Sequence, residues 1–245
     1  MGIDHEHIVG HEGARLVAVA RQGPLDAPVP GCPGWDVARL TGHVGRVHRW
    51  ATAGIRDGAE PDGTTLDRPP KGDTVVDWSA EAISPLLAAL KEAPAPGVWN
   101  FVGADDPDGS FWARRMAVET SIHRWDVEDA VGGAGETSPL DAALAAEGIE
   151  EELTVLAPRL LAGRDGIGIG GSLHLHATDA PSEWMVRTDG GALQAEPGHA
   201  KGDAALRGPA SSVLLVLYRR LRPGEGGTEV LGDADVLERW LALGV

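Results

Sequence analysis

The chain has 245 residues, of which 42% are hydrophobic, and its 37 acidic and 21 basic residues give a formal net charge of −16. This composition predicts a globular protein with a substantial core, and the negative charge argues against nucleic acid or an anionic membrane surface as a partner. We expect no membrane span and no secretion signal, because no apolar run approaches about 18 residues and the N-terminus lacks a basic, apolar leader. The single cysteine, Cys32, excludes an internal disulfide and a Cys-rich zinc module, so a reducing cytoplasm is the expected compartment.

The N-terminal part of the chain is predicted to be helical, because apolar residues recur at spacings of three and four. The predicted helices cover residues 7–20, 36–55, 77–93, 111–131 and 138–162. Asp36 is the expected N-cap of the second helix, and Pro85 predicts a kink or a restart in the third. Ser138 and Pro139 predict the start of the fifth, as cap and first helical residue. Residues 56–76 and 94–110, rich in Gly, Pro and Asp, are predicted loops.

After Gly163 the hydrophobic period changes from that of helices to that of strands. The predicted strands cover residues 167–177, 184–187, 192–195, 204–207 and 228–231, and the predicted helices residues 209–221 and 234–243. We therefore expect a helical domain over residues 1–163 and a small α+β domain over residues 164–245.

Several motifs have ordinary structural explanations. The run Gly166-Ile-Gly-Ile-Gly-Gly171 matches the dinucleotide fingerprint, but here a helix precedes it and a strand follows, which is the wrong order for nucleotide binding. His7 and His11, one helical turn apart, could share a metal, but a solvated face is the favoured interpretation. His174 and His176 share one face of a strand, which we interpret as a polar sheet face.

Two further residues near the second helix are also assigned no catalytic role. His48 lies five residues after His43 on the second helix, so the two side chains point about 140° apart and cannot both face the core. Cys32 is interpreted as a buried or loop thiol rather than a nucleophile, because no histidine or basic residue adjoins it in sequence.

The informative positions are His43, Glu119 and His123, which lie within the apolar stripes of two predicted helices. Glu119 and His123 are four residues apart and so are neighbours on one helix face. A carboxylate in an apolar stripe is costly unless its charge is compensated, and a divalent metal held by two histidines and one carboxylate would compensate it. Three protein ligands leave an open coordination position, which is typical of a catalytic zinc site. The alternative is a buried His–Glu hydrogen bond without a metal.

The same residues carry a resemblance to a known family. Residues 29–44, VPGCPGWDVARLTGHV, resemble the opening motif of the mycothiol-dependent maleylpyruvate isomerase family, and residues 119–126, ETSIHRWD, are similar to its second motif. Residues 208–221 resemble the helix of its C-terminal domain, and residues 231–241 its closing strand and helix. The resemblance spans nearly the whole chain in the right order.

The resemblance implies a DinB-like helical bundle followed by a small, sterol-carrier-like α+β domain. It implies a divalent metal, usually zinc, on His43, Glu119 and His123, and mycothiol, an actinobacterial thiol, as cosubstrate. Members include cis–trans isomerases, in which the thiolate adds to a cis-alkene, the new single bond rotates and elimination gives the trans product. A mycothiol S-transferase that stops at the adduct, or a non-catalytic metal-binding protein of this fold, are the alternatives.

The substrate of such a reaction is expected to be a small, anionic electrophile, which needs a positive contact in so acidic a chain. The family's usual Trp-Gly-Arg at the end of the C-terminal helix is replaced here by Tyr218-Arg219-Arg220. We expect Arg220 to make the contact, with Arg219 as the alternative, because residues one apart on a helix point about 100° apart. Asp126, three residues after His123, is expected to hold either a metal ligand or Arg124 in place, and the alternative is an acidic residue on the helix surface.

Overall fold

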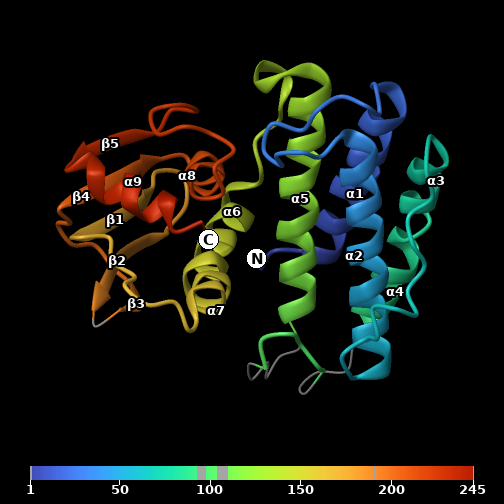
Figure 1. The fold of residues 1–245 in the computed structure, drawn as a ribbon, viewed down its shortest axis with the longest axis horizontal. Coiled ribbons are helices and arrows are strands. Elements are labelled where there is room, and N and C mark those ends of the chain that lie inside the picture. Colours follow the sequence, from blue (N-terminus) through green and yellow to red (C-terminus); the bar gives the residue numbers. More distant parts are fainter. Residues whose placement is uncertain (1, 93–97, 104–109, 190, 245) are drawn as a thin grey trace. The chain divides into compact units, whose positions relative to one another are not determined.

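The computed structural model describes residues 2–92, 98–103, 110–189 and 191–244. Its contacts divide the chain into two compact units, Met1–Ser138 and Pro139–Val245. The first is helical and the second combines a sheet with helices, so the expected succession of a helical bundle and an α+β domain is confirmed (Figure 1). Among the described residues, no helix has the length and apolarity needed to span a membrane.

Three long helices form the body of the N-terminal unit, α1 (His5–Gln22), α2 (Val37–Asp57) and α5 (Phe111–Gly132) (Figure 1). The expected cap of α2 is confirmed, since the Asp36 side chain accepts a hydrogen bond from the backbone N–H of Arg39 at 2.7 Å. The helix ends at Gly58, whose left-handed backbone (φ 63°) is the conformation that glycine adopts most easily. These caps satisfy backbone groups that the ends of a helix leave unpaired.

The third predicted helix is two helices, α3 (Thr74–Ala80) and α4 (Ile83–Glu92). The restart expected from Pro85 is observed, with the proline in the first turn of α4, where its missing N–H has no helical partner to lose. Both short helices pack against α1 and α2. Of the predicted loop over residues 94–110, residues 94–97 and 104–109 lie outside the described part of the chain.

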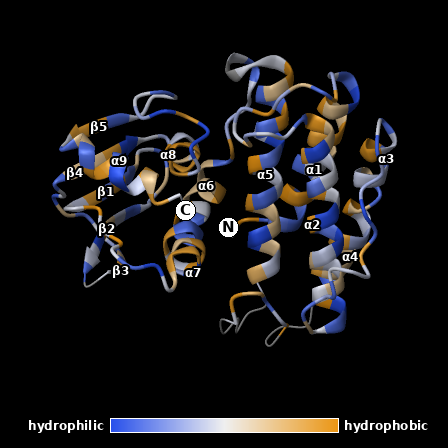
Figure 2. Ribbon diagram, viewed as in Figure 1, coloured by the Kyte–Doolittle hydropathy of each residue, from blue (hydrophilic) through white to orange (hydrophobic). Residues whose placement is uncertain are grey.

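The core of this unit lies between the helices. Leu16 of α1, Val37, Leu40 and Val44 of α2 and Val127 of α5 belong to one buried cluster. Each long helix carries hydrophobic and hydrophilic residues (Figure 2), and burial of the apolar ones supplies the main driving force for packing. Most of α5 is buried. Its buried residues include polar side chains, which the packing of an apolar core does not explain.

The C-terminal unit begins with α6 (Ala142–Glu151), a π-helical turn (Glu152–Leu156) and α7 (Ala157–Leu161). A five-stranded sheet follows, built from β1 (Ser172–Ala177), β2 (Glu183–Asp189), β3 (Ala192–Pro197), β4 (Ala204–Gly208) and β5 (Glu229–Gly232). Its strand order is β3-β2-β1-β4-β5, with β1 and β4 parallel and the other neighbours antiparallel. The helices α8 (Ala210–Leu217) and α9 (Ala234–Ala242) pack on the central strands.

The boundary between the compact units lies after Ser138, whereas the sequence placed it near residue 163. Residues 139–162 group with the C-terminal unit because α6 packs against α8, and the N–H of Leu140 donates to Ser211 Oγ at 2.9 Å. The expected cap Ser138 does not cap this helix. Asp141 does so, accepting from the N–H groups of Ala143 and Leu144 at 3.0 Å.

Ser138 instead closes a buried ion network in the N-terminal unit. Its carbonyl accepts from Arg124, and its N–H donates to Glu128 at 2.8 Å. Arg124 is 1% exposed and pairs with both Glu12 and Glu128. A buried charge requires such partners, so this network ties α1, α5 and the segment at Ser138 together.

The helix predicted over residues 209–221 is shorter than expected, since α8 ends at Leu217. Arg219 has a left-handed backbone, with φ 59°, and the N–H of Arg220 bonds to the carbonyl of Leu215. The helical-spacing argument for Arg219 and Arg220 therefore does not hold, because neither residue is in the helix. The family resemblance implies a glycine at this left-handed position, which glycine adopts most easily.

Candidate metal centre

Two neighbouring helices bring the three predicted residues together. His43 comes from α2, and Glu119 and His123 lie one turn apart on α5. The Nε2 atoms of both histidines lie 3.2 Å from Glu119 Oε1. The three ligand atoms all lie within 4.8 Å of one another.

The arrangement fits a divalent metal. Ligand atoms about 2.1 Å from a tetrahedral zinc ion lie about 3.4 Å apart, close to the two 3.2 Å separations. The donor set of two imidazoles and one carboxylate suits zinc and related transition metals. His43 keeps a side-chain exposure of 33%, so the group can be reached from solvent.

The Glu119 carboxylate is held ionised by its surroundings. Its side chain is only 14% exposed, and burial alone would raise the pKa. Arg115, which pairs with Oε2, and His123 outweigh the burial and hold the pKa of Glu119 well below its usual range. Arg115 therefore occupies one carboxylate oxygen while the other faces the two histidines.

The orientation of His123 is set by Asp126. Its Nδ1 lies 2.9 Å from Oδ2 of Asp126, a side chain with no exposure. Burial lowers the pKa of His123, but Glu119 and Asp126 raise it more, to about 9. A ring with this pKa is protonated on both nitrogens at neutral pH. A metal would displace the proton from Nε2, which faces Glu119 and His43, while Asp126 would keep the other proton on Nδ1. Of the two partners expected for Asp126, the candidate ligand His123 is in contact with it.

Two residues of the first motif border His43. The Trp35 ring meets the His43 ring at 5.0 Å between centroids, edge to face. The Sγ of Cys32 lies 3.7 Å from Asp126 Oδ2, and Cys32, His123 and Asp126 form a second group of closely spaced potential ligands. No histidine adjoins Cys32 in sequence, but the fold places one beside it, so the thiol lies at the edge of the candidate centre.

His48 is not one of the candidate ligands but lies in the core, whereas His43 is partly exposed, so the two histidines do not both face the core, as the helical spacing predicted. His48 is 1% exposed, and its Nε2 lies 2.9 Å from Thr120 Oγ1. Burial lowers its pKa to about 4, so it is neutral at physiological pH.

The contribution of Arg115 was missed by the sequence reasoning, although its position four residues before Glu119 carries the signal.

Arg220 lies in the C-terminal unit, after α8. Its guanidinium donates to the carbonyl of Tyr218 at 2.9 Å and lies 5.8 Å from the centre of the Tyr218 ring. The Arg219 guanidinium donates to the carbonyl of Leu241 at 3.2 Å, and the residue is exposed.

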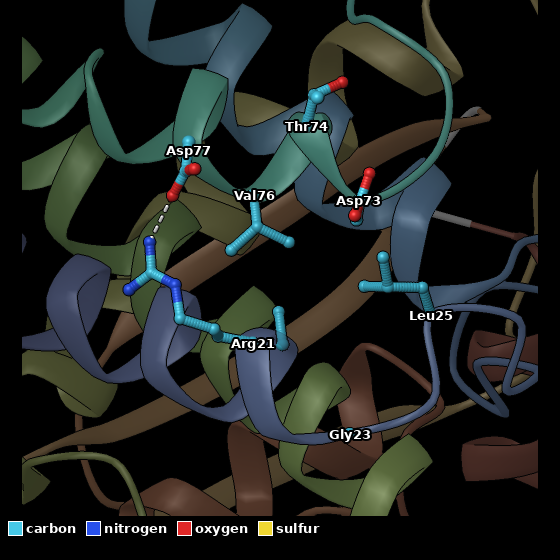
Figure 3. A pocket seen from close by; sticks show the side chains of 8 residues that line it. Arg21, Gly23, Leu25, Asp73, Thr74, Val76 and Asp77 are labelled. Carbon is cyan, nitrogen blue, oxygen red and sulfur yellow. Dashed lines mark hydrogen bonds and ion pairs between the residues drawn. The ribbon is translucent and has the colours of Figure 1, made fainter.

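Two pockets of the N-terminal unit are lined by residues other than the candidate metal ligands. The pocket in Figure 3 is formed by the end of α1 and by α3, and its Arg21 and Asp77 make an exposed ion pair that contributes little energy. The other pocket is basic, with Arg39, Arg46, Arg68 and Lys71 in its lining. Arg39 and Arg46 flank His43 on α2 by four and three residues, so positive charge lies close to the candidate centre on this helix.

Family models account for both units. The model of the mycothiol maleylpyruvate isomerase N-terminal domain matches residues 7–128, and that of the MDMPI C-terminal domain matches residues 143–239. The chain belongs to the mycothiol maleylpyruvate isomerase family. A search of curated proteins finds no match.

Two solved structures of the family share the fold of this chain, and a third is similar to part of it. A mycothiol-dependent maleylpyruvate isomerase is 16% identical, covers 93% of this chain and 91% of its own, and has a TM-score of 0.50. A histidine-to-alanine mutant of a mycothiol-dependent maleylpyruvate isomerase is also 16% identical, covers 86% of both chains and has a TM-score of 0.51. A UbiJ-SCP2 ubiquinone synthesis protein covers 41% of this chain and 88% of its own, at 19% identity and a TM-score of 0.31.

Proposed function

We propose that this protein is a metal- and mycothiol-dependent cis–trans isomerase of the maleylpyruvate isomerase type. The observation that carries the proposal is the convergence of His43 Nε2 and His123 Nε2 on Glu119 Oε1, each at 3.2 Å. Membership of the family supports mycothiol as the thiol and a small alkene acid as the substrate. The three side chains would hold one divalent ion, zinc in the first instance.

A zinc ion held there would lower the pKa of a coordinated thiol and so supply a thiolate at neutral pH. The protein's own residues prepare for this chemistry. Glu119 brings one negative charge to an otherwise neutral ligand pair, and Arg115 fixes the orientation of its carboxylate. Asp126 would keep one proton of His123 on Nδ1 when a metal displaces the other from Nε2.

The substrate's negative charge needs a positive contact, because the chain has a net charge of −16. We assign this contact to Arg220, whose planar guanidinium can bind a carboxylate with two parallel hydrogen bonds. The basic pocket lined by Arg39 and Arg46 beside α2 is a second candidate for this contact.

The direct test is turnover by the zinc-loaded protein. Wild type is incubated with mycothiol and maleylpyruvate, and the trans isomer is measured by chromatography. We expect product only when both compounds are present, and loss of product in His43→Ala and His123→Ala. His11→Ala, an exposed histidine outside the group, is the matched control. A thiol adduct without isomer would indicate a transferase, and unchanged turnover in both ligand variants would refute the proposal.

A further inference from the structure

Four side chains of the C-terminal unit form a second cluster of potential metal ligands. His174 and His176 lie on one face of β1, and Glu183 lies opposite His176 at the start of β2. His199 follows β3, and the neighbouring Gly198 donates its N–H to the carbonyl of Glu183 at 2.9 Å. Three separate segments therefore place these side chains together.

The distances within the cluster are short. Oε2 of Glu183 lies 3.0 Å from His174 Nε2, 3.3 Å from His176 Nδ1 and 2.5 Å from His199 Nδ1. The three imidazole centroids are 5.3 to 6.3 Å apart. One ligand atom from each of the four residues falls within 4.8 Å of the others.

Hydrogen bonding alone explains this geometry poorly. A carboxylate oxygen offers about two lone pairs, yet three ring nitrogens approach the same oxygen. A polar sheet face would need only solvated side chains, but His174 is 7% exposed. Three imidazoles and one carboxylate around a common centre are instead a ligand set that zinc and neighbouring transition metals favour.

We propose that His174, His176, Glu183 and His199 bind one divalent transition-metal ion of the zinc class. His174 Nε2, His176 Nδ1 and His199 Nδ1 are the nitrogen ligands, and the Glu183 carboxylate is the fourth. Four protein ligands complete a tetrahedral shell, which is typical of a structural site. The ion would join the segment after β3 to β1 and β2.

The exposure of the ligands gives the route of entry. The side chain of His199 is 77% exposed, whereas those of His176 and Glu183 are 25% and 29% exposed. The ion can therefore reach the three strand residues from solvent, and His199 closes the shell last. This site lies wholly within Pro139–Val245 and is independent of the isomerase proposal, whose ligands come from the other unit.

The test is zinc content per full-length chain after dialysis, measured by mass spectrometry. We expect two ions in wild type, one in the His43→Ala, His123→Ala double variant and one in a His176→Ala, His199→Ala double variant. His199→Ala alone, an exposed change that leaves the fold intact, should weaken zinc binding at this site at least about tenfold. His7→Ala with His11→Ala is the control and should leave both ions bound.

The outcomes separate the two sites. One ion in wild type that is lost only from the His176/His199 variant supports this inference and refutes the first metal centre. One ion lost only from the His43/His123 variant overturns this inference. Cobalt substitution in the His43/His123 variant gives a second measurement, since tetrahedral Co²⁺ absorbs visible light strongly. A spectrum without that absorption, or one unchanged by His199→Ala, also overturns the assignment.

Discussion

The Nδ1 atom of His123 lies 2.9 Å from Oδ2 of Asp126, a fully buried carboxylate one turn further along α5. This contact would keep one ring proton on Nδ1 when a metal displaces the other from Nε2. We predict that Asp126→Asn weakens zinc affinity by about tenfold or more, because the amide is a poorer hydrogen-bond acceptor. A competitive zinc titration measures the change, with Asp129→Asn on the same helix as the control. Equal affinity in Asp126→Asn and wild type would show that the contact is only structural.

The buried His48 predicts a loss of stability in acid. Its pKa is lowered to about 4 by burial, against 6.5 for the exposed ring of the unfolded chain, so the fold favours neutral His48. The stability that the fold gains from neutral His48 is fully present above pH 6.5 and is lost as the pH falls towards 4. Between pH 8 and pH 5 wild type should lose about 2 kcal/mol of unfolding free energy more than His48→Gln. Urea unfolding with a chelator present measures the difference, and parallel pH profiles of the two proteins would refute it.

Arg219 has a left-handed backbone, with φ 59°. Glycine adopts this conformation without a steric penalty, whereas residues with a Cβ pay about 1 kcal/mol. Arg219→Gly should therefore be more stable than Arg219→Ala by about 1 kcal/mol. Both variants lose the hydrogen bond to Leu241, so their comparison by urea unfolding isolates the backbone term. An alanine variant as stable as the glycine variant would contradict the assignment.

Arg220 is predicted to bind the carboxylate of the substrate. Arg220→Lys keeps the charge but loses the two-pronged geometry, so we expect KM for an anionic substrate to rise about tenfold with zinc content unchanged. Steady-state kinetics provide the measurement, and Arg222→Lys, an exposed neighbour, is the control. If Arg220→Ala has wild-type kinetics while Arg39→Ala raises KM, the basic pocket beside α2 binds the anion instead.

The sequence predicted helices and strands well where one hydrophobic repeat continued over a long segment with clear capping residues. The cap at Asp36, the restart around Pro85 and the pairing of Glu119 with His123 follow from local spacing. The meeting of His43 with these two residues was expected from the apolar stripes of two helices and from the family resemblance. The sequence failed where distant contacts decide. Residues 139–162 join the C-terminal unit because α6 packs on α8, and α8 stops at Leu217 because the backbone turns left-handed at Arg219.

The side-chain clusters also depend on contacts between residues that are distant in sequence. Cys32 lies beside Asp126 through a contact between residues 94 positions apart, which no local pattern reveals. His174 and His176 were visible as a pair on one strand face. The cluster with Glu183 and His199 depends on the pairing of β1 with β2 and on the position of the chain after β3.

Zinc content of the purified protein, measured for wild type and for His43→Ala, Glu119→Gln and His123→Ala singly, tests the central claim most directly. Each single variant should bind about one ion fewer than wild type, or bind that ion at least about tenfold more weakly, while circular dichroism shows an intact helical fold. Variants that all retain the wild-type zinc stoichiometry and affinity would contradict the assignment of these three residues as the metal centre.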